Sequence, residues 1–149
     1  MRVQGFETKS VRMERLWLLQ LFAPAEDVDR ILEHVCKIVP LVQGSYDSNA
    51  FQSAAGVERY RPLAGAMAGA ETELRRRPGV VEVSFELPVV EQVLKDVIET
   101  IYQVHSYQEP VVRVQEILSC RTKGLDDKMN PYRWWNTTGD WHATPSNGQ

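Results

Sequence analysis

Apolar residues recur at helical spacing in two stretches of this chain. The first stretch lies between Pro24 and Pro40, and its stripe comprises Val28, Ile31, Leu32, Val35 and Val39. The second stretch follows Pro88, and its stripe comprises Val90, Leu94, Val97, Ile98 and Ile101. Spacings of three and four place such residues on one side of a helix, and proline suits a first helical turn. The pattern therefore predicts two amphipathic helices, one closing at Pro40 and one running from Pro88 towards His105.

Other stretches have the patterns of strands. Residues 16–22 form a nearly continuous apolar run, typical of a central strand covered on both faces. Residues 81–87 alternate apolar side chains with Glu82, Ser84 and Glu86, which predicts a strand with one buried face. Residues 111–118 predict a last strand. Residues 44–71 predict two short strands and a long glycine-rich loop, and residues 75–79, Arg-Arg-Arg-Pro-Gly, predict a turn.

The resulting order is strand, helix, strand with an extra hairpin arm, strand, helix, strand. This order contains two split units of strand, helix and strand. With crossovers of the normal hand, the two units give an α+β ferredoxin-like sandwich, which is an antiparallel sheet with both helices on one face. The other face must meet water or another subunit. Leu16 and Leu18 cannot share one solvated face with Glu82 and Glu86, so we expect the chain to associate.

Three regions follow from this order. Residues 1–15 have no clean period and are expected to form an N-terminal arm, and residues 16–119 form the ferredoxin-like domain. Residues 120–149 form a C-terminal tail with three tryptophans, Trp134, Trp135 and Trp141. This tail is too apolar for a free disordered segment, so we expect it to pack on the domain or on a neighbour.

Composition narrows the function classes. The chain has 149 residues and a net charge of −3, which argues against an electrostatic grip on nucleic acid or on an anionic membrane. Residues 1–15 are polar and charged, without the apolar centre of a secretory signal, so a cytoplasmic protein is the default expectation. Cys36 and Cys120 are too few for a disulfide framework and are expected to be reduced thiols.

The glycine-rich loop is the first candidate site. Arg59 and Arg61 share a strand face if the segment is extended, and together they could clamp a phosphate or carboxylate. Pairing with Glu82 or Glu86 across the sheet is the equally plausible structural alternative. We expect the loop from Gly56 to Gly69 to lie near the turn at 105–110. The candidate ligand-binding residues are Tyr46, Arg59, Arg61, Gly65, Tyr107 and Glu109.

His105 and Glu109 have two readings. They can cap the second helix and order the turn after it, or they can contribute to a metal site. Tail residues that could join such a site are Asp126, Asp127, Asp140 and His142, although their spacing is irregular. No phosphate-loop, zinc or nucleophile motif is present in the sequence, so an enzyme is the less favoured reading and no cofactor is assigned.

Three ordered motifs resemble those of a known family. They are Gly44-Ser45-Tyr46-Asp47 with Phe51, Tyr60-Arg61-Pro62-Leu63 with Gly65-Ala66 and Gly69, and His105-Ser106-Tyr107-Gln108-Glu109-Pro110. They resemble the NGG-interacting-factor-three family (YqfO-like proteins), and more narrowly its inserted domain, over roughly residues 16 to 118. The chain departs from the family pattern at Asn49, Ser106 and Gln108, where the family commonly has Cys, Pro and Glu. Glu58-Arg59 also replace a shorter Gly-Thr-Phe lead-in to the second motif.

The resemblance implies a ferredoxin-like domain similar to CutA and PII proteins, which assemble as trimers. Full-length family members carry a two-metal site in a separate domain, and nothing in this chain corresponds to that domain, so the hydrolase activity is not carried over. CutA-like copper binding is likewise unsupported. The leading hypothesis is a non-enzymatic, oligomeric regulatory or ligand-sensing module that binds a small anionic ligand or a protein partner at clefts between the glycine-rich loop and the 105–110 turn. The alternatives are a divalent-metal-binding protein or metal-dependent enzyme, and a purely structural assembly unit.

Overall fold

A computed structural model of the chain describes residues 4–124 and 128–137. Its helices and strands follow one another as β1 (Phe6–Glu7), β2 (Val11–Pro24), the short 3-10 helix η1 (Ala25–Asp27), α1 (Val28–Ile38), β3 (Phe51–Gln52), β4 (Gly56–Tyr60), β5 (Arg75–Leu87), α2 (Glu91–Val104), β6 (Val112–Thr122) and η2 (Trp134–Asn136). In the described part of the chain, no helix is long and apolar enough to cross a membrane.

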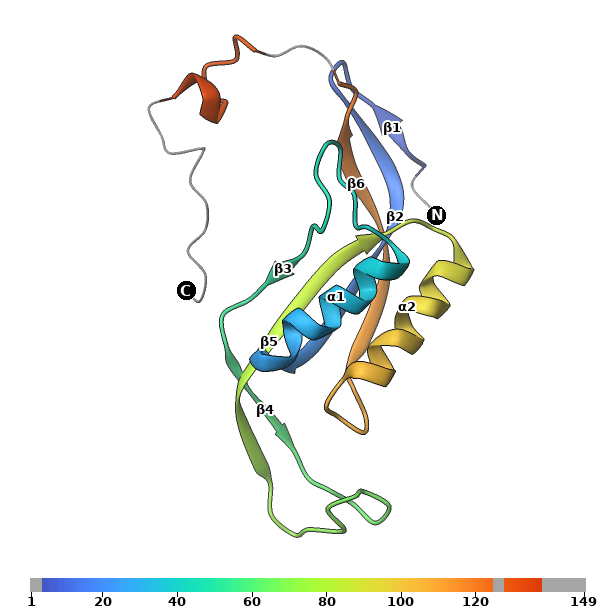
Figure 1. Cartoon of the computed structure of the whole chain (residues 1–149), viewed down its shortest axis with the longest axis vertical. Helices are drawn as coiled ribbons and strands as arrows, with labels where there is room; N and C mark the ends of the chain where they lie inside the picture. Colours follow the sequence, from blue (N-terminus) through green and yellow to red (C-terminus); the bar gives the residue numbers. More distant parts are fainter. Residues whose placement is uncertain (1–3, 125–127, 138–149) are drawn as a thin grey trace.

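Strand β2 lies at the centre of one antiparallel sheet. It pairs with β5 along one edge and with β6 along the other, and β3 and β4 pair with the far edge of β5. Helices α1 and α2 lie side by side on one face of the sheet (Figure 1). This is the order and layering of a ferredoxin-like sandwich, so the predicted α+β fold is confirmed.

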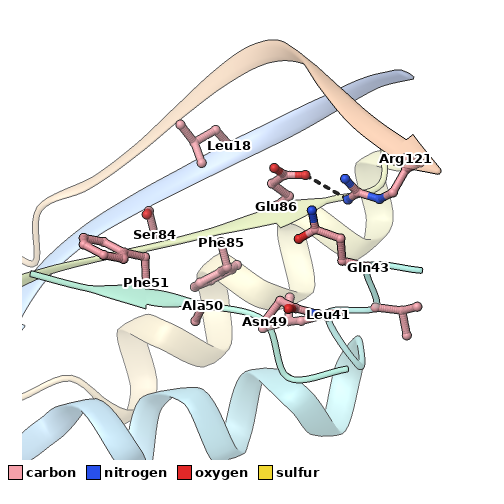
Figure 2. A pocket seen from close by; sticks show the side chains of 11 residues that line it. Leu18, Leu41, Gln43, Asn49, Ala50, Phe51, Ser84, Phe85, Glu86 and Arg121 are labelled. Carbon is pink, nitrogen blue, oxygen red and sulfur yellow. Dashed lines mark hydrogen bonds and ion pairs between the residues drawn. The ribbon is translucent and has the colours of Figure 1, made fainter. Parts of the chain in front are cut away.

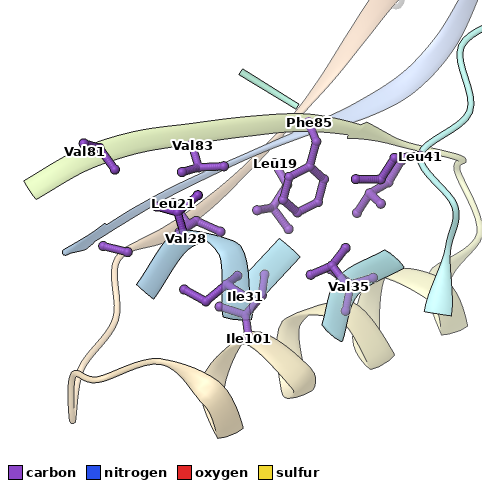
Figure 3. Packing of buried hydrophobic residues seen from close by; sticks show 13 residues of the cluster. Leu19, Leu21, Val28, Ile31, Val35, Leu41, Val81, Val83, Phe85 and Ile101 are labelled. Carbon is purple, nitrogen blue, oxygen red and sulfur yellow. The ribbon is translucent and has the colours of Figure 1, made fainter. Parts of the chain in front are cut away.

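The core forms between the sheet and the two helices. Leu19 and Leu21 of β2 are fully buried, and they face Ile31 of α1 and Ile101 of α2 in the same cluster (Figure 3). Alternation along β2 and β5 sends every second side chain into this layer, which is why Val81, Val83, Phe85 and Leu87 are all buried. The predicted stripe of α1 is confirmed, because Val28, Ile31 and Val35 are buried and Leu32 and Val39 pack against the cluster.

The second helix differs in detail from its prediction. It begins at Glu91 with Val90 as its N-cap, and Val90 is 49% exposed. Its packed side consists of Val93, Leu94, Val97, Ile101 and Val104. The stripe is thus rotated away from Val90 and Ile98, because the short segment after Pro88 stays extended before the helix starts.

The N-terminal segment is more regular than expected. Strand β2 begins at Val11, so residues 11–15, which we assigned to an irregular arm, extend the central strand and pair with residues 118–122 of β6. The two-residue strand β1 pairs with Arg12 and Met13 on the other side. The sequence pattern did not predict this extension, because charged residues at 12, 14 and 15 interrupt the alternation of apolar and polar side chains. Backbone pairing on both edges stabilises the strand there.

Residues 75–79 were predicted as a turn, and this is wrong. They form the first part of β5, and together with β4 they make a hairpin arm that projects beyond the sheet (Figure 1). The register shifts between Gly56 and Glu58, so that Pro78 and Gly79 of β5 oppose the single residue Val57. Such a bulge accommodates proline, which has no amide hydrogen to donate, and Gly79 adopts a φ of 76° there.

The second face of the sheet is not covered by a helix. It carries Leu16, Leu18, Gln20 and Phe22 from β2, all half-buried, together with Glu82 and Glu86 from β5. Both acids have partners on this face. Gln20 donates to Glu82 across 3.0 Å, and Arg121 donates to Glu86 across 2.8 Å. Apolar and charged side chains therefore share the uncovered face, which is the condition under which association is expected.

We predict that Gly79→Ala lowers the free energy of unfolding by about 1–2 kcal/mol, because an L-residue in the left-handed region is strained. Gly79 has a φ of 76°, although an added Cβ there would meet nothing within 4 Å. Gly56→Ala is the matched control in the same arm, because a Cβ at Gly56 makes only an ordinary contact of 3.9 Å with the Val80 carbonyl oxygen. Urea unfolding of both variants checks this, and equal losses would contradict the bulge.

Candidate functional site

A buried carboxylate joins the start of α1 to the turn after α2. Asp27 is 2% exposed, and it accepts hydrogen bonds from the backbone amide and the hydroxyl of Ser106. Arg30 forms an ion pair with Asp27 at 2.8 Å and donates through Nε to the Val104 carbonyl at 2.9 Å. Burial disfavours the charge on Asp27, but the hydrogen bonds from Ser106 and Arg30 outweigh it, so the pKa of Asp27 lies below its usual value. Asp27, at the start of the first helix, therefore serves mainly to hold the 105–110 turn.

His105 orders the same turn through both ring nitrogens. Nε2 lies 2.7 Å from the Phe22 carbonyl oxygen, which can only accept, so this nitrogen carries the hydrogen. Nδ1 then accepts the backbone amide of Tyr107 at 3.0 Å. With one nitrogen donating and the other accepting, His105 ties the turn to the end of β2. This arrangement fits the structural reading of His105.

The glycine-rich loop reaches this turn within one chain. The amide of Met67 donates to Oε1 of Gln108 at 3.1 Å, and Nε2 of Gln108 donates to the carbonyl of Gly65 at 3.4 Å. One glutamine side chain thus bridges the tip of the β4–β5 arm and the 105–110 turn, as we expected for these two segments.

Between the arm and the turn lies a group of aromatic and charged side chains, which we call the arm–turn cluster: Glu58, Tyr60, Arg75, Arg77 and Tyr107. Glu58 is paired with Arg77 and Tyr60 with Arg75 across the hairpin, so alternation places all four on one side of the arm. The Arg77 guanidinium lies 5.4 Å from the centre of the Tyr107 ring, within cation–π range. Arg75 is held by Glu71 and lies over Tyr60.

Two polar atoms of this cluster are buried and have no hydrogen-bond partner among the described residues. They are Oε1 of Glu58 and the hydroxyl of Tyr107. Buried polar atoms almost always have partners, so these two require an ordered water or a ligand. Burial raises the pKa of Tyr107, and the negative charge of Glu58 raises it further. The hydroxyl therefore stays protonated at neutral pH as a donor, next to the acceptor Glu58.

The structure brings some of the predicted residues to this place and leaves others elsewhere. Tyr107 belongs to the cluster, and the Gly65 carbonyl contacts the turn. Arg59 is paired with Arg76 on the opposite side of the arm, and Arg61 and Glu109 are exposed beside the cluster segments. Tyr46 does not join them, because its loop follows the C-terminal end of α1 whereas the turn is bonded to the N-terminal end (Figure 1). Arg59 and Arg61 do not pair with Glu82 or Glu86, which was the structural alternative. Glu82 instead accepts from Gln20, and Glu86 accepts from Arg121.

Sequence reasoning missed Glu58, Tyr60 and Arg77 as members of one cluster. The signal was present, since alternation along residues 58–60 and 75–77 would have placed them on one side of a hairpin. It was not used because residues 75–79 were taken as a turn, which removed the partner strand.

The described residues do not favour a metal site. Among residues 4–124 and 128–137, no group of three or more His, Cys, Asp or Glu side chains could hold an ion. His105, the strongest candidate, already uses both nitrogens in bonds to the backbone. All four tail candidates lie outside the described residues: Asp126, Asp127, Asp140 and His142.

The sequence matches no family model and no curated protein. Solved structures do resemble it. A Bacillus cereus protein related to NIF3 aligns with a TM-score of 0.59 and 19% identity over 74% of this chain. CutA1 from the psychrotrophic bacterium Shewanella sp. SIB1 aligns with a TM-score of 0.51 and 11% identity, covering 70% of this chain and 82% of that one. GlnK from B. subtilis aligns with a lower TM-score of 0.46 and 13% identity, covering 70% of this chain and 86% of that one.

The likeness shows the fold alone, because identity is low in each case. The alignment spans only 28% of the Bacillus cereus protein, so most of that protein has no counterpart in the matched region. The fold it shows is the CutA-like ferredoxin sandwich that the resemblance implied.

We predict that Asp27→Ala lowers the free energy of unfolding by about 2–4 kcal/mol at pH 7, because the Ser106 donors and Arg30 lose a buried partner. The pKa of Asp27 is depressed in the folded state, so its contribution is complete above the unfolded value of about 3.9 and is lost as pH falls through the folded value. The difference between wild type and variant should therefore shrink on acidification below about pH 4. Asp29→Ala, an exposed acid on the same helical turn, is the control, and urea unfolding at several pH values makes the measurement. A pH-independent difference would contradict the role of the charge.

Proposed function

We propose that this chain is a non-enzymatic ligand-sensing module that binds a small anionic ligand at the arm–turn cluster. The observation that carries the proposal is the pair of buried atoms without partners, the Tyr107 hydroxyl and Oε1 of Glu58, beside the Arg77 guanidinium. A guanidinium and a protonated hydroxyl are donors for an anionic group. Glu58 accepts from a hydroxyl or amino group on the same ligand. A protein partner that inserts an acidic side chain is the alternative occupant of this place.

The location suits a sensor because binding there acts on two segments that are distant in sequence. The arm contributes Glu58 and Arg77, and the turn contributes Tyr107 and the bridging Gln108. A ligand held between them stabilises one position of the arm relative to the sheet, and the exposed arm can report that position to a partner. The metal-binding alternative has no comparable support in the described residues.

The family assignment also belongs to this proposal. The three ordered motifs and the fold shared with the Bacillus cereus protein related to NIF3 support the view that this chain is a counterpart of the inserted domain of the YqfO-like family. The hydrolytic chemistry of that family is not part of the proposal. A cytoplasmic location stays a prediction.

We further propose that the chain is a homo-oligomer, with a trimer favoured by the resemblance to CutA and PII proteins. The physical support is the sheet face without a helix, where Leu16, Leu18 and Phe22 remain only half-buried. The tail adds apolar surface that requires cover, because Trp134 is 70% exposed and Tyr132 is 86% exposed.

The ligand site is tested with Tyr107→Phe. Removal of a hydroxyl without a partner should leave the free energy of unfolding unchanged or slightly higher, whereas binding of the ligand should weaken about tenfold or more. Arg61→Ala, at an exposed position beside the cluster, should cost about 2–4 kcal/mol of binding with little effect on folding. Native mass spectrometry of the purified protein identifies co-purified anions, and calorimetry with those compounds and with inorganic phosphate and citrate measures affinity.

Tyr102→Phe is the matched control, because Tyr102 is 52% exposed on α2. Equal affinities in wild type, in Tyr107→Phe and in Arg61→Ala would contradict the proposed site. A loss of stability in Tyr107→Phe would instead assign the hydroxyl to packing.

The oligomer is tested by placing a charge on the uncovered face. Leu16→Asp should shift the mass measured by light scattering towards the monomer at micromolar concentration, because the buried charge has no partner in the interface. Glu14→Gln is a control on the same strand and face. Truncation after Gly124, which spares β6, should weaken association if the tail clasps a neighbour. A wild-type chain that is monomeric at micromolar concentration would refute association.

A further inference from the structure

A hollow lies away from the arm–turn cluster, where the loop after α1 passes along β5. Its volume is about 260 Å³, and it is lined by residues of β2, β5, β6 and the 41–51 segment (Figure 2). Ligand pockets for drug-sized molecules span roughly 300–1,000 Å³, so this hollow suits a smaller molecule.

The loop that walls this hollow is held in an unusual conformation. Leu41 and Ser48 are the two residues other than glycine with positive φ among the described residues, at 54° and 57°. Leu41 is nevertheless 3% exposed, and its carbonyl accepts hydrogen bonds from both the amide and the side chain of Asn49. Bulky residues rarely adopt this conformation, and it persists where the surroundings over-determine it, often at functional sites. The wall is therefore preformed.

One end of the hollow carries a positive and a negative side chain, Arg121 and Glu86. Arg121 donates to Glu86 through Nη2 at 2.8 Å, and through Nη1 to the Ser119 hydroxyl at 3.1 Å and to the Cys120 carbonyl at 2.9 Å. These bonds use three of the five guanidinium donors, so Nε–H and one Nη2 hydrogen have no acceptor among the described residues. Glu86 accepts one hydrogen bond on each oxygen, from Arg121 and from Ser119, and each oxygen retains a second lone pair.

The other end is apolar. Figure 2 shows the Phe51 ring at the end of the hollow opposite the Glu86–Arg121 pair, with Leu18 and Phe85 also lining it. Phe51 is 68% exposed although it begins a strand, whereas Phe85 is buried. A large aromatic ring left in water at the rim of a hollow is a surface that a ligand can cover.

We propose that this hollow binds a free α-amino acid with an apolar side chain. The charges of Arg121 and Glu86 are in direct contact, so a ligand that satisfies both must carry a carboxylate and an ammonium on neighbouring atoms. An α-amino acid has that arrangement, and its side chain points from the α-carbon towards Phe51. A simple anion would meet the Glu86 carboxylate, and an apolar molecule would leave the pair without new partners.

This second site is independent of the arm–turn cluster. It shares no residue with that cluster, so either proposal can fail without the other. Leu18 and Glu86 do belong to the uncovered sheet face, so an oligomer that covered both Glu86 and Phe51 would also contradict the site. A protein with both sites would respond to two ligands of different chemistry.

The experiment is isothermal titration calorimetry on the full chain with L-phenylalanine, 3-phenylpropanoate and phenethylamine. The second compound lacks the ammonium and the third lacks the carboxylate, while the apolar ring is retained. L-phenylalanine should bind, and each analogue should bind at least about 30-fold more weakly, because the analogue leaves one of the two half-buried charges, Arg121 or Glu86, without a partner on the ligand.

Variants assign the site. Arg121→Gln and Glu86→Gln should abolish detectable binding of L-phenylalanine, whereas Glu82→Gln, on the same strand and face, should bind normally. The variants that remove a charge could fail to fold, so Phe51→Ala is tested as well. Because Phe51 is exposed, its replacement should have little effect on the free energy of unfolding. This variant should bind L-phenylalanine about tenfold or more weakly, and its affinity for L-alanine should be unchanged.

Three outcomes would overturn the proposal. They are no binding of L-phenylalanine, L-leucine or L-methionine at millimolar concentration, equal binding of L-phenylalanine and phenethylamine, and unchanged affinity for L-phenylalanine in Phe51→Ala.

Discussion

The alternation of side chains along β2 is the constraint on which the rest of the structure depends. Because β2 is paired on both edges, its pleat cannot rotate, and every second residue is committed to the helices. Leu19 and Leu21 therefore form the sheet side of the core. Leu16 and Leu18 lie on the opposite face, which α1 and α2 do not cover. The core, the uncovered face and the hollow beside Leu18 all follow from one strand register. The association that we propose would cover the face that this register leaves without a helix.

Polar side chains then place the irregular segments on that sheet. Asp27 and His105 hold the 105–110 turn from two sides, one through Ser106 and one through the carbonyl of Phe22. Three of the positions at which the sequence departs from the motifs it resembles also make such bonds. Asn49 holds Leu41, Ser106 bonds Asp27, and Gln108 bridges to Gly65 and Met67.

The two candidate sites differ in how much of them is visible in the sequence. The arm–turn cluster was partly foreseen, because glycines, tyrosines and arginines gather in residues 44–71 and the 105–110 turn has loop chemistry. Its key members, Glu58 and Arg77, were missed because their pairing depends on a bulge at Pro78 and Gly79 that the local pattern indicates as a turn. The hollow at Glu86 and Arg121 was not foreseen at all. Its charged residues come from β5 and β6, 35 positions apart, and neither belongs to a motif.

The sequence by itself determined the order of strands and helices, the side of α1 that packs inward and the ferredoxin-like topology. Those features depend on local periodicity and on the handedness of crossovers, both of which can be recognised without coordinates. Tertiary structure alone decided the extension of β2 to Val11, the start of α2 at Glu91 and the inclusion of residues 75–79 in the second strand of the hairpin arm. It also decided which polar groups meet. These features depend on pairing and burial between residues distant in the chain, where backbone hydrogen bonds and desolvation outweigh local preference.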